Sequence, residues 1–277
     1  LAVTYEDVLE FFESRQEMPK RIPSLDATRK ALVRLDLSRQ KILERLSLNS
    51  QRLIVVAGTN GKGSVAATLD HLFRQNGERV GFFSSPHLED YTERIRIDGR
   101  DLSRTDFVRA FIEVKKRLAD MDVSHFEMLF LMAAWVFFSD SFGNDFDRVI
   151  FEVGMGGRWD ATNTLPHGIT IFTQLGLDHQ KFLGSTLESV ARNKFDILQS
   201  AQSIHVFHAP FASSLEPLVA EYQKRYLGVW KAREDFSMSV KEGPQFFINF
   251  DSKTYALGLP GKRGAENTAL AFTVVKN

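Results

Sequence analysis

Hydrophobic positions along the chain switch repeatedly between the short apolar runs of strands and the three-to-four spacing of helices. The apolar runs predict strands, which we place at 53–57, 79–84, 148–153, 169–174 and 204–207. Residues at helical spacing predict helices, which we place after the first strand and at 105–121, 128–138, 186–199, 213–226 and 265–275. Because strands and helices alternate, we expect an α/β fold with a mostly parallel sheet flanked by helices.

Two segments depart from this alternation. Residues 1–50 carry apolar positions at helical spacing and predict a helical N-terminal segment. Residues 236–258 alternate between apolar and polar positions and are broken by Glu242-Gly243-Pro244, which predicts a small antiparallel meander at the sheet edge. No long linker interrupts the chain, so we expect one domain over residues 1–277.

Composition limits the possible functions. Lys plus Arg and Asp plus Glu both number 35, so net charge gives no argument for nucleic acid or an anionic membrane. The chain has no cysteine, which excludes disulfides, thiolate metal sites and cysteine nucleophiles. The longest apolar run, at 128–138, is too short to span a bilayer, and Ser124 and Glu127 before it have capping-box spacing. We expect a cytoplasmic monomer that binds small molecules, and no nucleic-acid or membrane partner.

The most informative segment is the glycine-rich turn between the first strand and the next helix, in the sequence VAGTNGKGS. Gly58, Gly61 and Gly63 let the backbone approach phosphate oxygens, and Lys62 supplies a positive charge. Backbone N–H groups at the start of a helix also favour an anion. The turn therefore predicts a P-loop-type nucleotide phosphate site, with a plain tight turn as the alternative.

The turn differs from the usual P-loop pattern at two positions. Val56 stands where that pattern has its first glycine. Gly63 stands where it has a hydroxyl, and Ser64 comes one residue later. The order of strand, turn, lysine and helix nevertheless agrees with a phosphate site.

Polar residues follow three other predicted strands, and the carboxyl ends of parallel strands are where α/β proteins bind ligands. Ser85 could place an oxygen on a metal or a phosphate, or could merely open a loop. Glu152 lies within an apolar strand, and a buried carboxylate needs a cation: Mg²⁺ beside the phosphate turn, or Arg158 or another arginine. Asp178-His179 could be a site or a capping turn.

Taken together, four segments resemble the folylpolyglutamate synthase/dihydrofolate synthase family of the Mur-ligase superfamily. They are VAGTNGKGS, SSPHL followed by ERIRIDG, FEVGMGGRWDATN, and LGLDHQKFLGSTLESVARNK. The resemblance covers about residues 50–200 and returns at LPGKRGAENTALA. It implies a Mur-ligase-type ATP-binding domain with ATP and Mg²⁺ as cofactors.

The resemblance also implies roles for matched positions. Lys62, His179 and Lys194 would be catalytic, and Asn267 would touch the adenine of ATP. The phosphates would lie on the turn, which comprises Gly58, Thr59, Asn60, Gly61, Lys62, Gly63 and Ser64. Metal ions would be held by Ser85, Glu152, His179 and Lys194, the lysine acting as a carbamate on a second metal.

The implied activity is ATP-dependent addition of L-glutamate to a folate or dihydropteroate carboxylate through an acyl phosphate. The chain departs from the family at Asn193, where glutamate is usual, and at Arg263 and Gly264, which replace His-Gln. The family also has a second, Rossmann-like domain after the Gly261 segment, which we expect this chain to lack. Another Mur-superfamily amide ligase and a catalytically inactive nucleotide-binding module remain as alternatives.

The phosphate turn generates a first prediction. The Lys62→Ala substitution should abolish ATP binding and leave the fold intact, because a phosphate needs that charge and a hydrophobic core does not. Titration with a fluorescent nucleotide measures the affinity, and circular dichroism controls for folding. Unchanged affinity in the variant would contradict the phosphate site.

Overall fold

A computed structural model describes residues 3–15, 25–143, 145–200, 205–224, 229–231, 237–240, 246–250, 252–258 and 261–276. In this described part, eight strands form one sheet in the order β4-β3-β2-β5-β1-β6-β7-β8. Every neighbouring pair from β2 to β8 is parallel, as expected. The strands are β1 (Leu53–Ala57), β2 (Val80–Phe83), β3 (Ile95–Ile97), β4 (Arg100–Asp101), β5 (Arg148–Glu152), β6 (Ile169–Phe172), β7 (His205–His208) and β8 (Val229–Lys231).

Three of these strands are absent from the sequence prediction. β3 and β4 form an antiparallel hairpin at one edge, and β8 lies at the other. The hairpin turn is Asp98-Gly99, and both residues have positive φ, which is the backbone that such a dipeptide favours. β3 and β4 have only three and two residues. Runs that short carry too little periodicity to be recognised.

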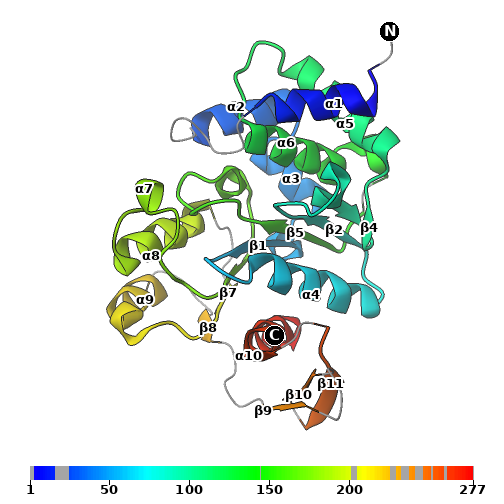
Figure 1. Ribbon diagram of the computed structural model, residues 1–277. Helices are drawn as coiled ribbons and strands as arrows, with labels where there is room; N and C mark the ends of the chain where they lie inside the picture. The colour runs from blue at the N-terminus through cyan, green and yellow to red at the C-terminus, as the bar shows by residue number, and fades with distance from the viewer. Residues whose placement is uncertain are drawn as a thin grey trace.

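Helices cover both faces of the sheet (Figure 1). On one face lie α4 (Lys62–Gln75) and α10 (Gly261–Lys276), which pack along each other. The other face is covered by α5 (Arg104–Arg117), α6 (His125–Phe138), α8 (Leu187–Phe195) and α9 (Glu216–Gln223). Against α5 and α6 pack the N-terminal helices α1 (Tyr5–Glu13) and α2 (Leu25–Arg34), while α3 (Arg39–Arg45) adds Ile42 to the same core.

Strand β1 shows why the sheet needs both layers. Ile54 and Val56 pack with residues of α4 and α10, whereas Val55 and Ala57 belong to the core that contains α6. All five residues of β1 are buried. Successive side chains of a strand point to opposite faces, so a strand that is apolar throughout must be covered on both.

The predicted meander forms a separate antiparallel sheet of three strands in the described residues, in the order β11-β10-β9. Its strands are β9 (Ser237–Val240), β10 (Phe246–Phe250) and β11 (Lys253–Ala256). Ile248 and Phe250 of β10 pack on Ala265 and Ala269 of α10. Figure 1 shows the small sheet beside this helix. Of the residues expected there, 236, 241–245 and 251 lie outside the described residues, as do 204, 225 and 226 of other predicted elements.

The apolar segment at 128–138 forms helix α6, which is buried along nearly its whole length. Ser124 and Glu127 form the predicted capping box, since each side chain accepts a hydrogen bond from the backbone N–H of the other. Within the described residues, no helix combines the length and the apolar character that crossing a membrane requires.

Candidate functional site

Helix α4 begins directly at the glycine turn. Gly61 is its N-cap residue and has φ 86°, in the left-handed region that favours glycine. The side chain of Asn267 on α10 lies against this position, because a Cβ atom at Gly61 would come within 2.6 Å of Asn267 Oδ1. The N–H groups of Lys62, Gly63 and Ser64 open the helix and have no carbonyl one turn earlier to bind. The start of α4 is therefore a potential anion site.

The preceding part of the turn is fastened to the segment after β6. The N–H groups of Thr59 and Asn60 both donate to the carbonyl of Gln174, at 2.8 and 3.4 Å. Thr59 Oγ1 exchanges hydrogen bonds of 3.0 Å with the backbone N–H and C=O of Gly176. These two N–H groups are thus used by the protein itself. An anion would be bound by the start of α4 and by Lys62, whose Nζ donates to Thr59 O at 3.3 Å.

Glu152 lies at the carboxyl end of β5, and it is only 5% exposed. Its Oε2 accepts a hydrogen bond of 3.1 Å from Ser85 N–H, and a Cβ atom at Gly63 would come within 3.3 Å of the same oxygen. Burial raises the pKa of Glu152 to about 7, although the Ser85 N–H and the charge of Lys62 oppose the shift. The carboxylate therefore connects β5 with the phosphate turn and with the loop after β2.

A salt bridge from Arg158 was one possible partner for Glu152. In the structure Arg158 pairs instead with Asp196, at 2.6 Å. Among the described residues, no lysine, arginine or histidine lies within ion-pair distance of the Glu152 carboxylate. A buried carboxylate without an ion-pair partner fits a bound cation better than a structural salt bridge.

Lys194, near the end of α8, is 1% exposed. Its Nζ donates a hydrogen bond of 2.8 Å to the carbonyl of Gly58, at the start of the phosphate turn. Burial, and next the charge of Lys62, lower the pKa of Lys194 to about 8. The backbone of Gly157 also lies so close to the Lys194 carbonyl that a Cβ atom there would overlap it.

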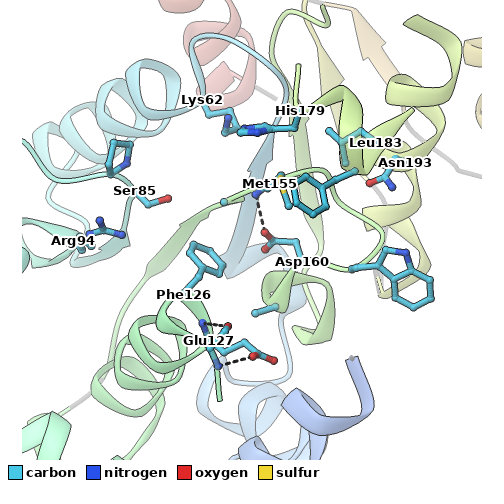
Figure 2. Close-up of a pocket in the computed structure, with 16 residues that line it drawn as sticks. Lys62, Ser85, Arg94, Phe126, Glu127, Met155, Asp160, His179, Leu183 and Asn193 are labelled. Atoms are coloured by element: carbon cyan, nitrogen blue, oxygen red, sulfur yellow. Dashed lines mark hydrogen bonds between the residues drawn. The ribbon is translucent and has the colours of Figure 1, made fainter. Parts of the chain in front are cut away.

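A cavity of about 340 Å³ opens beside the phosphate turn (Figure 2). Three predicted site residues from different strand ends, Lys62, Ser85 and His179, all line it. His179 begins the short helix α7 (Gln180–Leu183), and its Nε2 lies 3.5 Å from Asp178 Oδ2. The fold therefore brings these three segments to one place. In the described part of the chain, no three His, Asp or Glu side chains are grouped closely enough to hold a metal ion by themselves.

Most of the cavity wall was not predicted from the sequence. Its other lining residues include the aromatic side chains Phe126, Trp159 and Phe182 and the charged side chains Arg94, Glu127 and Asp160. Glu127 was predicted only as a helix cap, Phe126 lay outside the motifs, and the other four lay inside motifs without an assigned role of their own. Burial raises the pKa of Asp160, whose carboxylate accepts hydrogen bonds from the N–H groups of Met155 and Thr162.

Residues 56–275 match the family model described as Mur ligase middle domain. The chain belongs to the Mur ligase family. The resemblance seen in the sequence is thereby confirmed. The dihydrofolate synthase/folylpolyglutamate synthase of Escherichia coli (strain K12) is 37% identical over 188 residues, which are 65% of this chain and 44% of that protein. The matched part of the chain thus spans less than half the length of this curated relative.

Two solved structures extend the comparison to 99% of the chain. E. coli FolC in complex with DHPP and ADP has a TM-score of 0.73 and 26% identity, and the chain covers 62% of it. A bifunctional folylpolyglutamate synthase/dihydrofolate synthase with Mn, AMPPNP and L-glutamate bound has a TM-score of 0.71 and 28% identity, with 62% covered. The Mur ligase fold of the chain is therefore that of these enzymes.

The raised pKa of Glu152 predicts how pH acts on stability without metal. A pKa that is higher in the folded state contributes stability below the unfolded value of 4.5, and this is lost as pH rises through about 7. Glutamine does not titrate, so the free energy of unfolding of Glu152→Gln relative to that of the wild type should rise across this window, by roughly 3 kcal/mol at pH 8. Urea unfolding with a chelator present measures the difference.

The control is Glu13→Gln, which changes an exposed glutamate on α1. Its stability difference from the wild type should change far less between pH 4.5 and 8. If the stability of Glu152→Gln relative to the wild type did not rise between pH 4.5 and 8, the buried carboxylate would not carry the penalty that its environment implies.

Proposed function

We propose that the chain is the ATP-binding part of an ATP-dependent ligase that adds L-glutamate to a dihydropteroate or folate carboxylate. The observation that carries the proposal is the cavity, which reaches from Lys62 on the phosphate turn to the aromatic and acidic residues of α6 and the loop after β5. Its volume, about 340 Å³, suits a small-molecule ligand. Relatives bind DHPP with ADP, and AMPPNP with Mn and L-glutamate.

In this proposal the turn from Gly58 to Ser64 places the start of α4 against the ATP phosphates, and Lys62 neutralises part of their charge. Asn267 is proposed to contact the adenine, since α10 brings it against Gly61. The carboxylate of the acceptor becomes an acyl phosphate, and the amino group of glutamate then attacks it. Such transfers depend on positioning and charge neutralisation more than on a nucleophilic side chain. The protein would act as a cytoplasmic monomer.

The residues around Glu152 fit a divalent cation, which we propose to be Mg²⁺. Glu152 offers a buried carboxylate without an ion-pair partner, and Ser85 and His179 come from neighbouring strand ends. Mg²⁺ takes few protein oxygens and completes its shell with phosphate and water, so no cluster of three acidic or histidine ligands is required. When bound, the ion would neutralise phosphate charge during transfer.

Lys194 is proposed to react with carbon dioxide and to serve as a carbamate ligand of a second metal. The neutral amine attacks the carbon of CO₂, a C–N bond forms, and a proton leaves the nitrogen. A pKa of about 8 leaves more neutral amine at physiological pH than an ordinary lysine has. The carbamate keeps one N–H group, which can still donate to Gly58 O.

Isotope-labelled bicarbonate should therefore give a carbamate signal in the NMR spectrum of the wild type, and Lys194→Met should abolish it. Mn²⁺ affinity should also fall about tenfold when bicarbonate is removed, as expected for the loss of one charged ligand. Lys181→Met is a matched control on the neighbouring helix α7. A signal that survives in Lys194→Met, or its absence from the wild type, would contradict the modification.

Binding decides the proposed function better than turnover, because the chain covers less than two thirds of the length of its E. coli relative. Calorimetric titration should show that the chain binds Mg·ADP and, separately, dihydropteroate or folate. Lys62→Ala should lose the nucleotide and keep the acceptor. Ile112→Ala on α5 is a control outside the cavity.

Each alternative predicts another pattern of binding. Another Mur-type amide ligase would bind a carboxylate-bearing cell-wall precursor in preference to both pteridine compounds. An inactive nucleotide-binding module would bind Mg·ADP and none of these acceptors. Either result would replace the proposed function. With ATP and glutamate added, we expect the chain alone to form little glutamylated product, as judged by mass spectrometry.

A further inference from the structure

The phosphate turn lies at the border between two layers of the fold. On one side is the cavity, whose wall includes Phe126 and Glu127 of α6. On the other side is α10, which packs along α4 on the opposite face of the sheet (Figure 1). Among the described residues that line the cavity, none belongs to α10. An acceptor in the cavity therefore leaves the α10 side of the turn to the nucleoside of ATP.

Two neighbouring residues of α10 connect this helix with the turn. The side chain of Asn267 lies against Gly61. The carboxylate of Glu266 accepts a hydrogen bond of 2.6 Å from Gln174 Nε2, in the segment after β6. The backbone carbonyl of Gln174 in turn accepts the N–H group of Thr59, at 2.8 Å. Glu266 is thus joined to the phosphate turn through a single residue, which fixes the position of its carboxylate.

Glu266 uses only one of its two carboxylate oxygens within the described part of the chain. Arg263 Nη1 donates to the same Oε2 atom that Gln174 binds, at 2.8 Å. The other oxygen, Oε1, has no hydrogen-bond partner among the described residues. The side chain is 18% exposed, so a ligand can reach it. A carboxylate oxygen has two lone pairs and can accept two hydrogen bonds.

The ion pair with Arg263 explains how a carboxylate can lie beside a phosphate site. An isolated glutamate would repel a polyphosphate. The guanidinium of Arg263 places a positive charge next to Glu266, so the pair as a whole is neutral. Arg263 is also a position at which the chain departs from its family, where His-Gln is usual. The pair therefore provides a hydrogen-bond acceptor near the turn without adding net negative charge.

We propose that Oε1 of Glu266 accepts hydrogen bonds from the ribose hydroxyl groups of the bound nucleotide. This assignment rests on the proposed function, and it adds the residue that recognises the sugar. The ribose joins the phosphates, proposed for the start of α4, to the adenine, proposed for Asn267, so its hydroxyl groups come near the adjacent residue Glu266. An acidic side chain also binds a ribose hydroxyl in dinucleotide-binding α/β folds. The site would thus select ribonucleotides.

The test compares Mg·ADP with Mg·2′,3′-dideoxy-ADP, which lacks both hydroxyl groups, by calorimetry on the whole chain. The wild type should bind ADP at least about tenfold more tightly, because the dideoxy nucleotide cannot donate to the carboxylate. Glu266→Ala should bring this ratio of affinities close to one. Glu266→Gln should keep part of the ratio, since it retains the shape of the side chain and loses the charge.

The ratio separates recognition of the ribose from support of the phosphate turn. If Glu266 only held Gln174 in place, its replacement would weaken both nucleotides by the same factor, and the ratio would not change. The missing hydroxyl groups also alter the sugar conformation of the dideoxy nucleotide. That effect belongs to the ligand and is the same for the wild type and for each variant, so it cancels when the ratios are compared.

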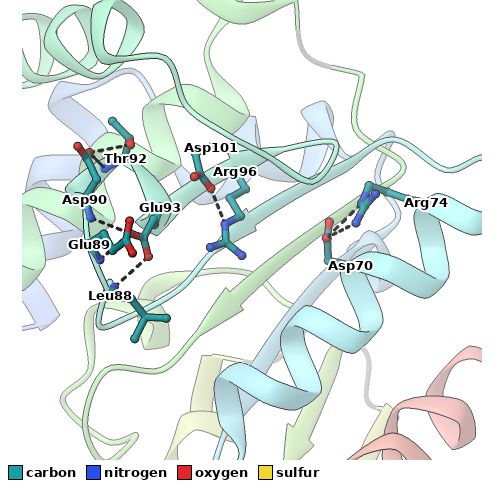
Figure 3. Close-up of polar contacts among 9 residues, drawn as sticks. All are labelled: Asp70, Arg74, Leu88, Glu89, Asp90, Thr92, Glu93, Arg96 and Asp101. Carbon is teal, nitrogen blue, oxygen red and sulfur yellow. Dashed lines mark hydrogen bonds and ion pairs between the residues drawn. The ribbon is translucent and has the colours of Figure 1, made fainter. Parts of the chain in front are cut away.

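The matched control is Asp101→Ala, which removes another carboxylate that pairs with an arginine, Arg96, at the far edge of the sheet (Figure 3). It should keep the wild-type ratio. Equal wild-type affinity for the two nucleotides, or an unchanged ratio in a folded Glu266→Ala, overturns the role of Glu266 and leaves the proposed function standing. If Glu266→Ala does not fold, an unchanged ratio in Glu266→Gln overturns the role as well. Failure of the wild type to bind Mg·ADP rejects the proposed function and this role together.

Discussion

The hydrogen bond from Lys194 Nζ to Gly58 O joins the end of α8 to the phosphate turn, across 136 residues of sequence. This hydrogen bond gives the buried amino group of Lys194 an acceptor and fixes the carbonyl of Gly58 at the start of the turn. Gly58 has φ 143° and packs so closely on Thr173 that a Cβ atom would overlap its hydroxyl. The turn is held from the other side by Thr59 and Gly176. Its N–H groups are thus preorganised, and preorganised dipoles bind developing charge without further cost.

Two buried ionisable groups lie on either side of this turn, and burial shifts each toward its neutral form. The pKa of Glu152 is raised to about 7, and that of Lys194 is lowered to about 8. Both groups therefore titrate near neutral pH, where a bound cation or a reaction with carbon dioxide changes their charge easily. Burying these two ionisable groups costs free energy in the ligand-free domain, and binding of ligands of the right charge would offset that cost.

The order of the strands in the sheet brings the candidate site residues to one cavity. Because β5 lies between β2 and β1, the loops after these strands, and the loop after β6 on the other side of β1, end at one edge of the sheet. Lys62, Ser85 and His179 reach the cavity from three of them. The aromatic side chains Trp159 and Phe182 remain 43% and 38% exposed at its wall. A ligand with a flat ring system would cover them, which is consistent with the folate-related relatives.

The sequence by itself determined the alternation of strands and helices, the position of the glycine-rich turn between β1 and α4, and the α6 capping box, because each is encoded in residues that are close together in the sequence. It also carried the family resemblance. Tertiary structure alone decided that Arg158 pairs with Asp196, leaving Glu152 without an ion pair, and that Arg94, Glu127 and Asp160 share a cavity. These contacts depend on which strands become neighbours. Hydrophobic periodicity reports which face of an element is buried, and it holds no information on the element that covers that face.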